Sequence, residues 1–269
     1  MVHDSEEIIS HNRLISAPEH SRLFSTDTFK VGNKVIRNIL LSCDHGLMIV
    51  NRFDCNSNRV GQGQMLLDHG NVSTVESVYC HDSIKHIENP VIFDIGANIG
   101  TFTTWMAKAF PLGKIYSFEP QRSVFQMLCG NMAINNIYNV HAYNFGIGST
   151  YCILRTKEPN YFKNVDYGTY TLNTNASLER VDQDLNIEVR PLDLVVDQYG
   201  VTRVDLIKID VEGMDMDVIY GGIETIKKFR PKIFIEHIRN GTSIKDEIIQ
   251  VLTPYQYDFR LIDNNILCS

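Results

Sequence analysis

From residue 91 onward, short apolar runs alternate with stretches in which apolar residues recur at helical spacing. The runs are rich in β-branched residues and are bounded by Gly, Pro or polar residues, as buried strands are. The expected strands are VIFDI (91–95), KIYSFE (114–119), VHAYNF (140–145), VDLIKID (204–210) and KIFIEHI (232–238). The expected helices are 101–110, 121–136, 190–200 and 216–229. This alternation predicts βαβ units, a parallel sheet and right-handed crossovers, hence an α/β fold.

The tail after residue 243 adds a helix and then two short strands. Asp263, Asn264 and Asn265 lie between these strands, and such residues favour a tight turn. We therefore expect an antiparallel hairpin at the edge of the sheet.

The first 88 residues have a weaker pattern and are interpreted as an N-terminal extension that packs on a domain spanning 89–269. Residues 1–30 are polar and predict a loosely packed arm. Residues 31–90 contain short apolar pieces that predict a few strands, with a pair of helices over 64–88.

A second irregular stretch, 150–186, interrupts the strand–helix rhythm and is rich in Tyr, Asn and Thr. Long insertions at the carboxyl edge of such sheets often form substrate walls. Tyr161, Tyr167 and Tyr170 could then stack on a ring of the substrate. A surface hairpin without function explains the stretch equally well.

Composition excludes several classes of partner. The formal charge is −7 over 269 residues, which argues against non-specific nucleic-acid binding. The longest apolar stretches are too short to span a membrane, and the start MVHDSEEIIS lacks a signal-peptide pattern, so we expect a cytoplasmic protein. Six scattered cysteines are typical of free thiols. The oligomeric state stays open, a homodimer included.

The loop after the first of these strands reads DIGANIG, with small or polar residues at alternate positions: Asp94, Gly96, Asn98 and Gly100. In open α/β sheets ligands bind beyond the carboxyl ends of the strands. A pyrophosphate needs bare backbone at the helix start, and Asn98 stands where a dinucleotide loop has its middle glycine. S-adenosylmethionine has no phosphate, so the loop favours that cofactor.

Glu119 ends the second strand, 19 residues after Gly100. An acid at this place can accept hydrogen bonds from both ribose hydroxyls of an adenosine cofactor. The position suits NAD as well, so it does not choose between cofactors. Alternatively, Glu119 only caps the helix that begins near Gln121.

Three stretches resemble the FkbM-type S-adenosylmethionine-dependent methyltransferases: FDIGANIGTFT (93–103), SFEP (117–120) and the block from RPLDLVVDQYG to KIFIEHI (190–238). The resemblance implies a Rossmann-like class I methyltransferase fold with a mostly parallel seven-stranded sheet and an antiparallel C-terminal edge hairpin. It also implies methyl transfer to oxygen, on a sugar or a natural-product-like small molecule. The acid after VEG departs from the usual pattern, since it comes at Asp215, and its role is left open.

The resemblance implies a set of cofactor-binding residues. The methionine end would be held by Asp94, Gly96, Ala97, Asn98, Gly100 and Thr101. Glu119 would hold the ribose, while Asn144 and Gly146 would lie near the adenine.

Candidate catalytic residues follow the later strands: Lys208, Asp210, Glu212, Glu236 and His237. His237 is the natural general base near neutral pH, although a satisfied structural histidine is an equal alternative. Lys208 shares a strand face with Asp210, and we favour an ion pair with Asp94 or Asp210 over a catalytic role. No metal is expected, although Asp210, Glu212, Glu236 and His237 offer ligands that could hold Mg²⁺.

Two other functions compete with an O-methyltransferase. A nicotinamide-dependent oxidoreductase could use the same sheet, but Asn98 argues against it. A methyltransferase-like fold could also serve as a non-catalytic binding module, although the cofactor residues are intact.

Overall fold

The computed structural model describes residues 30–31, 34–35, 37–56, 61–72, 74–164, 167–169, 180–239 and 241–269. Tyr170 and nearly all of the predicted arm 1–30 lie outside these ranges. No helix within them combines the length and the apolar character needed to cross a bilayer.

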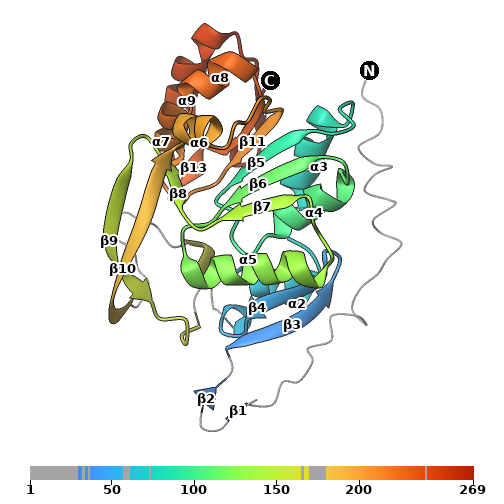
Figure 1. Ribbon diagram of the computed structural model, residues 1–269, viewed down its shortest axis with the longest axis vertical. Helices are drawn as coiled ribbons and strands as arrows, with labels where there is room; N and C mark the ends of the chain where they lie inside the picture. The colour runs from blue at the N-terminus through green and yellow to red at the C-terminus, as the bar shows by residue number, and fades with distance from the viewer. Residues whose placement is uncertain are drawn as a thin grey trace.

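A seven-stranded sheet forms the centre of the molecule, with the order β15-β16-β12-β11-β5-β6-β7 (Figure 1). Its strands are β5 (Val91–Ile95), β6 (Lys114–Phe118), β7 (Val140–Tyr143), β11 (Leu206–Ile209), β12 (Lys232–Glu236), β15 (Phe259–Ile262) and β16 (Asn265–Cys268). Neighbours from β7 to β12 are parallel, whereas β16 is antiparallel to both β12 and β15. The predicted mostly parallel sheet and C-terminal hairpin are confirmed. Only the inner strand of the hairpin is reversed, so the edge strand β15 runs with the parallel set.

Helices cover both faces of this sheet. On one face lie α3 (Thr74–Ile84), α4 (Thr101–Ala109) and α5 (Arg122–Ile134); on the other lie α6 (Leu192–Gln198), α7 (Asp215–Gly221), α8 (Ile223–Phe229) and α9 (Lys245–Leu252). Alternate residues of β5 serve the two cores, because Ile92 packs with α3 and α4 whereas Phe93 packs on the face covered by α6–α9.

Two of the predicted helices differ from the structure. The helix expected over 190–200 begins only at Leu192, because Arg190 and Pro191 end a strand. The helix expected over 216–229 is divided at Gly222 into α7 and α8. A Cβ at Gly221 would lie 1.9 Å from the Gly148 carbonyl oxygen, so this glycine is needed for close packing.

The N-terminal segment comprises β1 (Lys30–Val31), β2 (Lys34–Val35), β3 (Asn38–Cys43), β4 (Gly46–Asn51), η1 (Asp54–Asn56) and α2 (Gln62–His69). Its β3–β4 hairpin packs against α5 (Figure 1). The buried amide of Asn131 on α5 accepts a hydrogen bond from the Ile49 N–H and donates to the carbonyls of Ile49 and Ile99. This amide therefore connects the β3–β4 hairpin to the loop after β5.

A separate three-stranded sheet, with the order β8-β10-β9, projects from the side of the molecule (Figure 1). It is built from β8 (Gly146–Gly148), β9 (Cys152–Pro159) and β10 (Arg180–Pro191). Short elements complete the fold: η2 (Tyr167–Thr169), β13 (Ile238–Arg239), β14 (Thr242–Ser243) and η3 (Thr253–Tyr255). Tyr161 and Tyr167, predicted to stack on a substrate, are each 3% exposed and pack with the N-terminal segment instead.

Candidate active site

Five of the predicted site residues lie at the same edge of the central sheet, each at the carboxyl end of a parallel strand. Ile95, Phe118, Tyr143, Ile209 and Ile235 are in register across five parallel strands. The residues that follow them in the chain are, in that order, Gly96, Glu119, Asn144, Asp210 and Glu236. We call this set the strand-end row. Parallel strands thus bring together residues that lie as far as 140 positions apart, as the sequence predicted.

Gly96 allows two strand ends to approach closely. Its φ is +84°, and a Cβ built on it would lie 1.8 Å from the carbonyl oxygen of Asp210. An L side chain is therefore opposed both by the backbone conformation and by lack of space.

We expect Gly96→Ala to destabilise the protein by more than the roughly 1–2 kcal/mol that a left-handed alanine costs. Gly200→Ala is the matched control, because Gly200 has φ +59° and a Cβ there would meet nothing within 4 Å. Urea denaturation of the two variants measures the difference. Equal destabilisation would show that the approach to Asp210 costs nothing.

The backbone N–H groups of the loop after β5 already donate hydrogen bonds within the protein. Those of Gly96 and Ala97 donate to the Phe118 carbonyl, and that of Gly100 donates to the Ala97 carbonyl. The N–H of Asn98 donates to Glu119, and that of Ile99 to the Asn98 side-chain oxygen. A pyrophosphate needs such N–H groups to be open, so this loop does not suit a dinucleotide. Because these N–H groups already have acceptors, the loop backbone is also less suited to bind the carboxylate at the methionine end of the cofactor.

Glu119 connects the end of β6 to the loop after β5. Its Oε1 accepts the Gln121 N–H at 2.8 Å and its Oε2 accepts the Asn98 N–H at 3.0 Å. The Asn144 amide donates to the carbonyls of Glu119 and Pro120. Each carboxylate oxygen can accept a further hydrogen bond, so the group fits a ribose diol. Burial raises the pKa of Glu119 to about 7, although the two N–H groups oppose this.

Lys208 is a buried cation held between two acids. Its Nζ lies 3.6 Å from Asp94 Oδ1 and 3.5 Å from Asp210 Oδ2, and it donates to the Gly96 carbonyl at 3.3 Å. Burial by itself lowers the Lys208 pKa, but the carboxylates of Asp210 and Asp94 reverse this and raise it above its ordinary value. Both ion pairs that the sequence suggested are therefore present.

Asp215 organises the loop that follows β11. One of its carboxylate oxygens accepts the Val211 N–H at 3.3 Å, and the other accepts the Gly213 N–H at 3.2 Å. Glu212, between them, has φ +54°, a conformation that a non-glycine residue adopts only when it is held there. The acid whose role the sequence left open thus holds the segment that carries Glu212.

His237 lies one residue beyond the strand-end row. Its N–H donates to the Asn264 carbonyl, and its own carbonyl accepts the Ile244 N–H. The ring is 6% exposed, with Nδ1 3.2 Å from Ser243 Oγ. These contacts connect His237 to the C-terminal hairpin and to β14 rather than to Lys208 or Asp210.

Several supporting residues were missed in the sequence. Thr103 Oγ1 donates to Asp94 Oδ2 at 2.5 Å and lies 2.9 Å from Ser117 Oγ, so α4 fixes the buried acid. Thr101, expected at the cofactor, donates instead to Gln62 of α2 at 3.2 Å. The run of threonines at the start of α4 was the only available signal for the first contact; nothing local pointed to the second.

The remaining predicted positions are also placed. Ala97 is buried against Leu128 and Met132 of α5. Gly146 does not end the third strand but begins β8, where it pairs with Val189 of β10. Among the described residues, no group of three or more His, Cys, Asp or Glu side chains is arranged to hold a metal ion.

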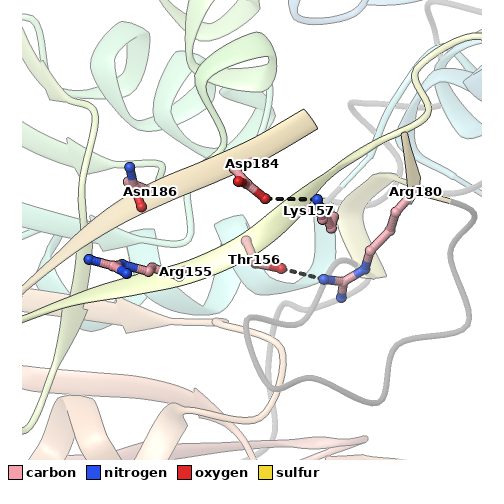
Figure 2. A pocket seen from close by; sticks show the side chains of 6 residues that line it. All are labelled: Arg155, Thr156, Lys157, Arg180, Asp184 and Asn186. Atoms are coloured by element: carbon pink, nitrogen blue, oxygen red, sulfur yellow. Dashed lines mark hydrogen bonds and ion pairs between the residues drawn. The ribbon is translucent and has the colours of Figure 1, made fainter. Parts of the chain in front are cut away.

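A cavity of about 550 Å³ lies on the projecting sheet, lined by Arg155, Thr156, Lys157, Arg180, Asp184 and Asn186 (Figure 2). Lys157 pairs with both Asp182 and Asp184 at 2.8 Å, which compensates its charge. Asp184 is five residues along β10 from Val189, the partner of Gly146, or about 17 Å at strand spacing. The cavity is therefore separate from the strand-end row.

A sequence profile described as the Methyltransferase FkbM domain matches residues 94–261, more than half of the chain. The chain belongs to the FkbM methyltransferase family. The resemblance seen in the sequence is confirmed, and S-adenosylmethionine is the cofactor of the family. The match decides against the nicotinamide-dependent oxidoreductase. It covers the whole strand-end row, from Gly96 to Glu236.

Curated relatives of this FkbM-family chain are distant. Methyltransferase 1 of Beauveria bassiana is 28% identical over 158 residues, covering 53% of this chain and 62% of the relative. Methyltransferase sdnD of Sordaria araneosa is 30% identical over 170 residues, covering 53% and 64%. The 2-O-methyltransferase NoeI of Sinorhizobium fredii is 26% identical over 161 residues, covering 55% and 63%. The chain thus spans less than two thirds of the length of these relatives.

A solved structure, the FkbM methyltransferase of Methylobacillus flagellatus, aligns with a TM-score of 0.49 at 18% identity. The alignment covers 81% of this chain and 57% of that one. A likeness this distant adds nothing to the topology described above, which is read from the strands themselves.

Proposed function

We propose that this chain is an S-adenosylmethionine-dependent O-methyltransferase that acts on a hydroxyl of a small molecule, a saccharide or a natural-product-like compound. The observation that carries the proposal is the strand-end row, in which a loop without open N–H groups stands beside Glu119, an acid whose two oxygens accept one backbone N–H each. The family match supports methyl transfer, and the name of the relative NoeI supports oxygen as the acceptor atom.

We assign each residue of the site a separate role in binding the cofactor or the acceptor. Glu119 accepts hydrogen bonds from the ribose hydroxyls, and the loop from Gly96 to Gly100 forms the floor beneath the methionine end. Asp210, whose side chain is 40% exposed, accepts from the cofactor's ammonium group or from the acceptor. Lys208 stays a buried structural cation. These assignments use hydrogen-bond acceptors where the ligand offers donors.

The chemistry requires alignment and a place for one proton. When bound, S-adenosylmethionine would supply an electrophilic methyl group on a sulfonium; the acceptor oxygen would displace it, and the electron pair of the carbon–sulfur bond would stay on sulfur. The acceptor hydroxyl gives its proton to the imidazole of His237, the residue that follows β12. Glu236 and Glu212 supply further acceptors for the hydroxyls of a polyol.

Cofactor binding should depend on pH through Glu119. Its pKa of about 7 means that the carboxyl is roughly one-tenth ionised at pH 6 and nine-tenths ionised at pH 8. Because the ionised form accepts hydrogen bonds from the ribose more strongly, the affinity for S-adenosylhomocysteine should rise up to about tenfold over this range. Calorimetry at each pH measures this. In Glu119→Gln the slope should vanish; a slope that persists would assign the proton to another group.

A transfer assay tests the function itself. The chain is incubated with methyl-labelled S-adenosylmethionine and a panel of mono- and oligosaccharides and hydroxylated natural products, and labelled methyl ether is measured. We expect label on at least one hydroxyl compound and none with His237→Gln. Cofactor binding without transfer to any member of the panel would favour the non-catalytic binding module.

A further inference from the structure

The His237 imidazole has one nitrogen with a partner and one without. Nδ1 lies 3.2 Å from Ser243 Oγ on β14. Nε2 is buried and makes no hydrogen bond within the part of the chain that the structure describes. A buried polar atom left in this state costs free energy, so it calls for an explanation.

The contacts of Ser243 decide which nitrogen carries the proton. A serine hydroxyl accepts two hydrogen bonds and donates one. Ser243 Oγ already accepts the Lys245 N–H at 3.2 Å. If Nδ1–H also donates to it, both lone pairs are used, and the hydroxyl proton of this exposed serine is open to water.

The other tautomer is less favourable. Ser243 would then donate to Nδ1, and the proton of the neutral ring would lie on Nε2. That would leave a buried N–H of His237 with no acceptor, whereas the Nδ1–H form leaves one unused lone pair on Nε2; a buried donor without an acceptor is the rarer case in proteins. Hydrogen-bond accounting therefore places the proton on Nδ1.

We propose that Ser243 is a positioning residue that holds His237 in its Nδ1–H form, so that Nε2 is the ring nitrogen whose lone pair can take the proton of the acceptor hydroxyl. The backbone supports this arrangement, because hydrogen bonds to Asn264 and Ile244 fix His237 on both sides. The part that concerns the acceptor rests on the proposed function, whereas the tautomer does not.

Nitrogen NMR of the full chain, labelled with ¹⁵N-histidine, tests the tautomer without cofactor or acceptor. Long-range ¹H–¹⁵N spectra at alkaline pH distinguish protonated from unprotonated ring nitrogens, and His237→Gln identifies the signals. We expect a protonated Nδ1 and an unprotonated Nε2. In Ser243→Ala the ring should become a mixture with a large Nε2–H fraction, and Ser243→Thr should restore the original pattern.

Ser149→Ala is the matched control, because it removes a hydroxyl that bonds to Asp217 on α7 and should leave the His237 signals unchanged. A protonated Nε2 in the unaltered chain would overturn the proposal, as would a Ser243→Ala spectrum identical to it. Once an acceptor is known, Ser243→Ala should lower kcat several-fold with cofactor affinity unchanged, and threonine should rescue it. Loss of O-methylation activity with the tautomer confirmed would refute only the proposed function.

Discussion

Replacing Lys208 with methionine should lower the free energy of unfolding by about 3–5 kcal/mol, the usual cost of removing one partner from a buried ion pair. Lys208 is 4% exposed and Asp94 is fully buried, so the change leaves a carboxylate that water does not reach. Thr103 then provides the hydrogen bond that remains to Asp94. Urea denaturation at neutral pH measures the loss.

Two further variants test whether the loss of stability comes from the buried charge. Lys227→Met removes the exposed partner of Glu224 and should have little effect, because exposed pairs are screened by water. The double variant Lys208→Met with Asp94→Asn should recover part of the stability, since it removes the stranded charge. A double variant no more stable than Lys208→Met alone would show that burial of charge is not the cause.

Glu119→Ala should weaken the binding of S-adenosylhomocysteine by about 100-fold, equivalent to roughly 2.7 kcal/mol. Hydrogen bonds to charged groups contribute about 1.5–3 kcal/mol each, and the ribose loses its acceptor in this variant. The Asn98 N–H also loses its partner, so the loop that forms the floor of the site is released. Isothermal calorimetry measures the affinity.

A variant at a second acidic residue distinguishes this effect on affinity from that of a general change in charge. Glu224→Ala removes an acidic side chain on α8, outside the strand-end row, and should leave the affinity unchanged. The thermal unfolding temperature of each variant shows whether the fold is intact. If folded Glu119→Ala bound as tightly as the unaltered chain, Glu119 would be a helix cap alone.

The sheet and the strand-end row were predictable because both follow from short-range rules. Each buried strand is a short, mostly apolar run that is followed directly by a residue of the row, as in VIFDI before Gly96 and LIKI before Asp210. Parallel strands meet at one edge whatever their separation in sequence, so the row needs no knowledge of side-chain packing.

Long-range contacts of particular side chains were not predictable. Tyr161 looked like a substrate-binding ring, but it packs with β3, β4 and α2, over 90 residues away in the sequence. Gln62 contacts Thr101, and Ser243 contacts His237, without any local pattern that marks them. Asn98 is predicted to hold the cofactor, but nothing in the sequence indicated that its N–H and side-chain oxygen also stabilise the loop itself.

The boundary between strand and helix was also misjudged where a single residue decides it. Pro191 is compatible with the start of a helix, but here it ends β10, the strand that pairs with β8. Gly222 interrupts an apolar pattern that reads as one continuous helix.

A structure of the chain with S-adenosylhomocysteine bound would show whether the cofactor occupies the strand-end row. We expect the nucleoside over this row, with both ribose hydroxyls hydrogen-bonded to Glu119 and the thioether sulfur facing the ends of β11 and β12. A nucleoside bound at any other edge of the sheet, with Glu119 still bonded only to Asn98 and Gln121, would contradict it.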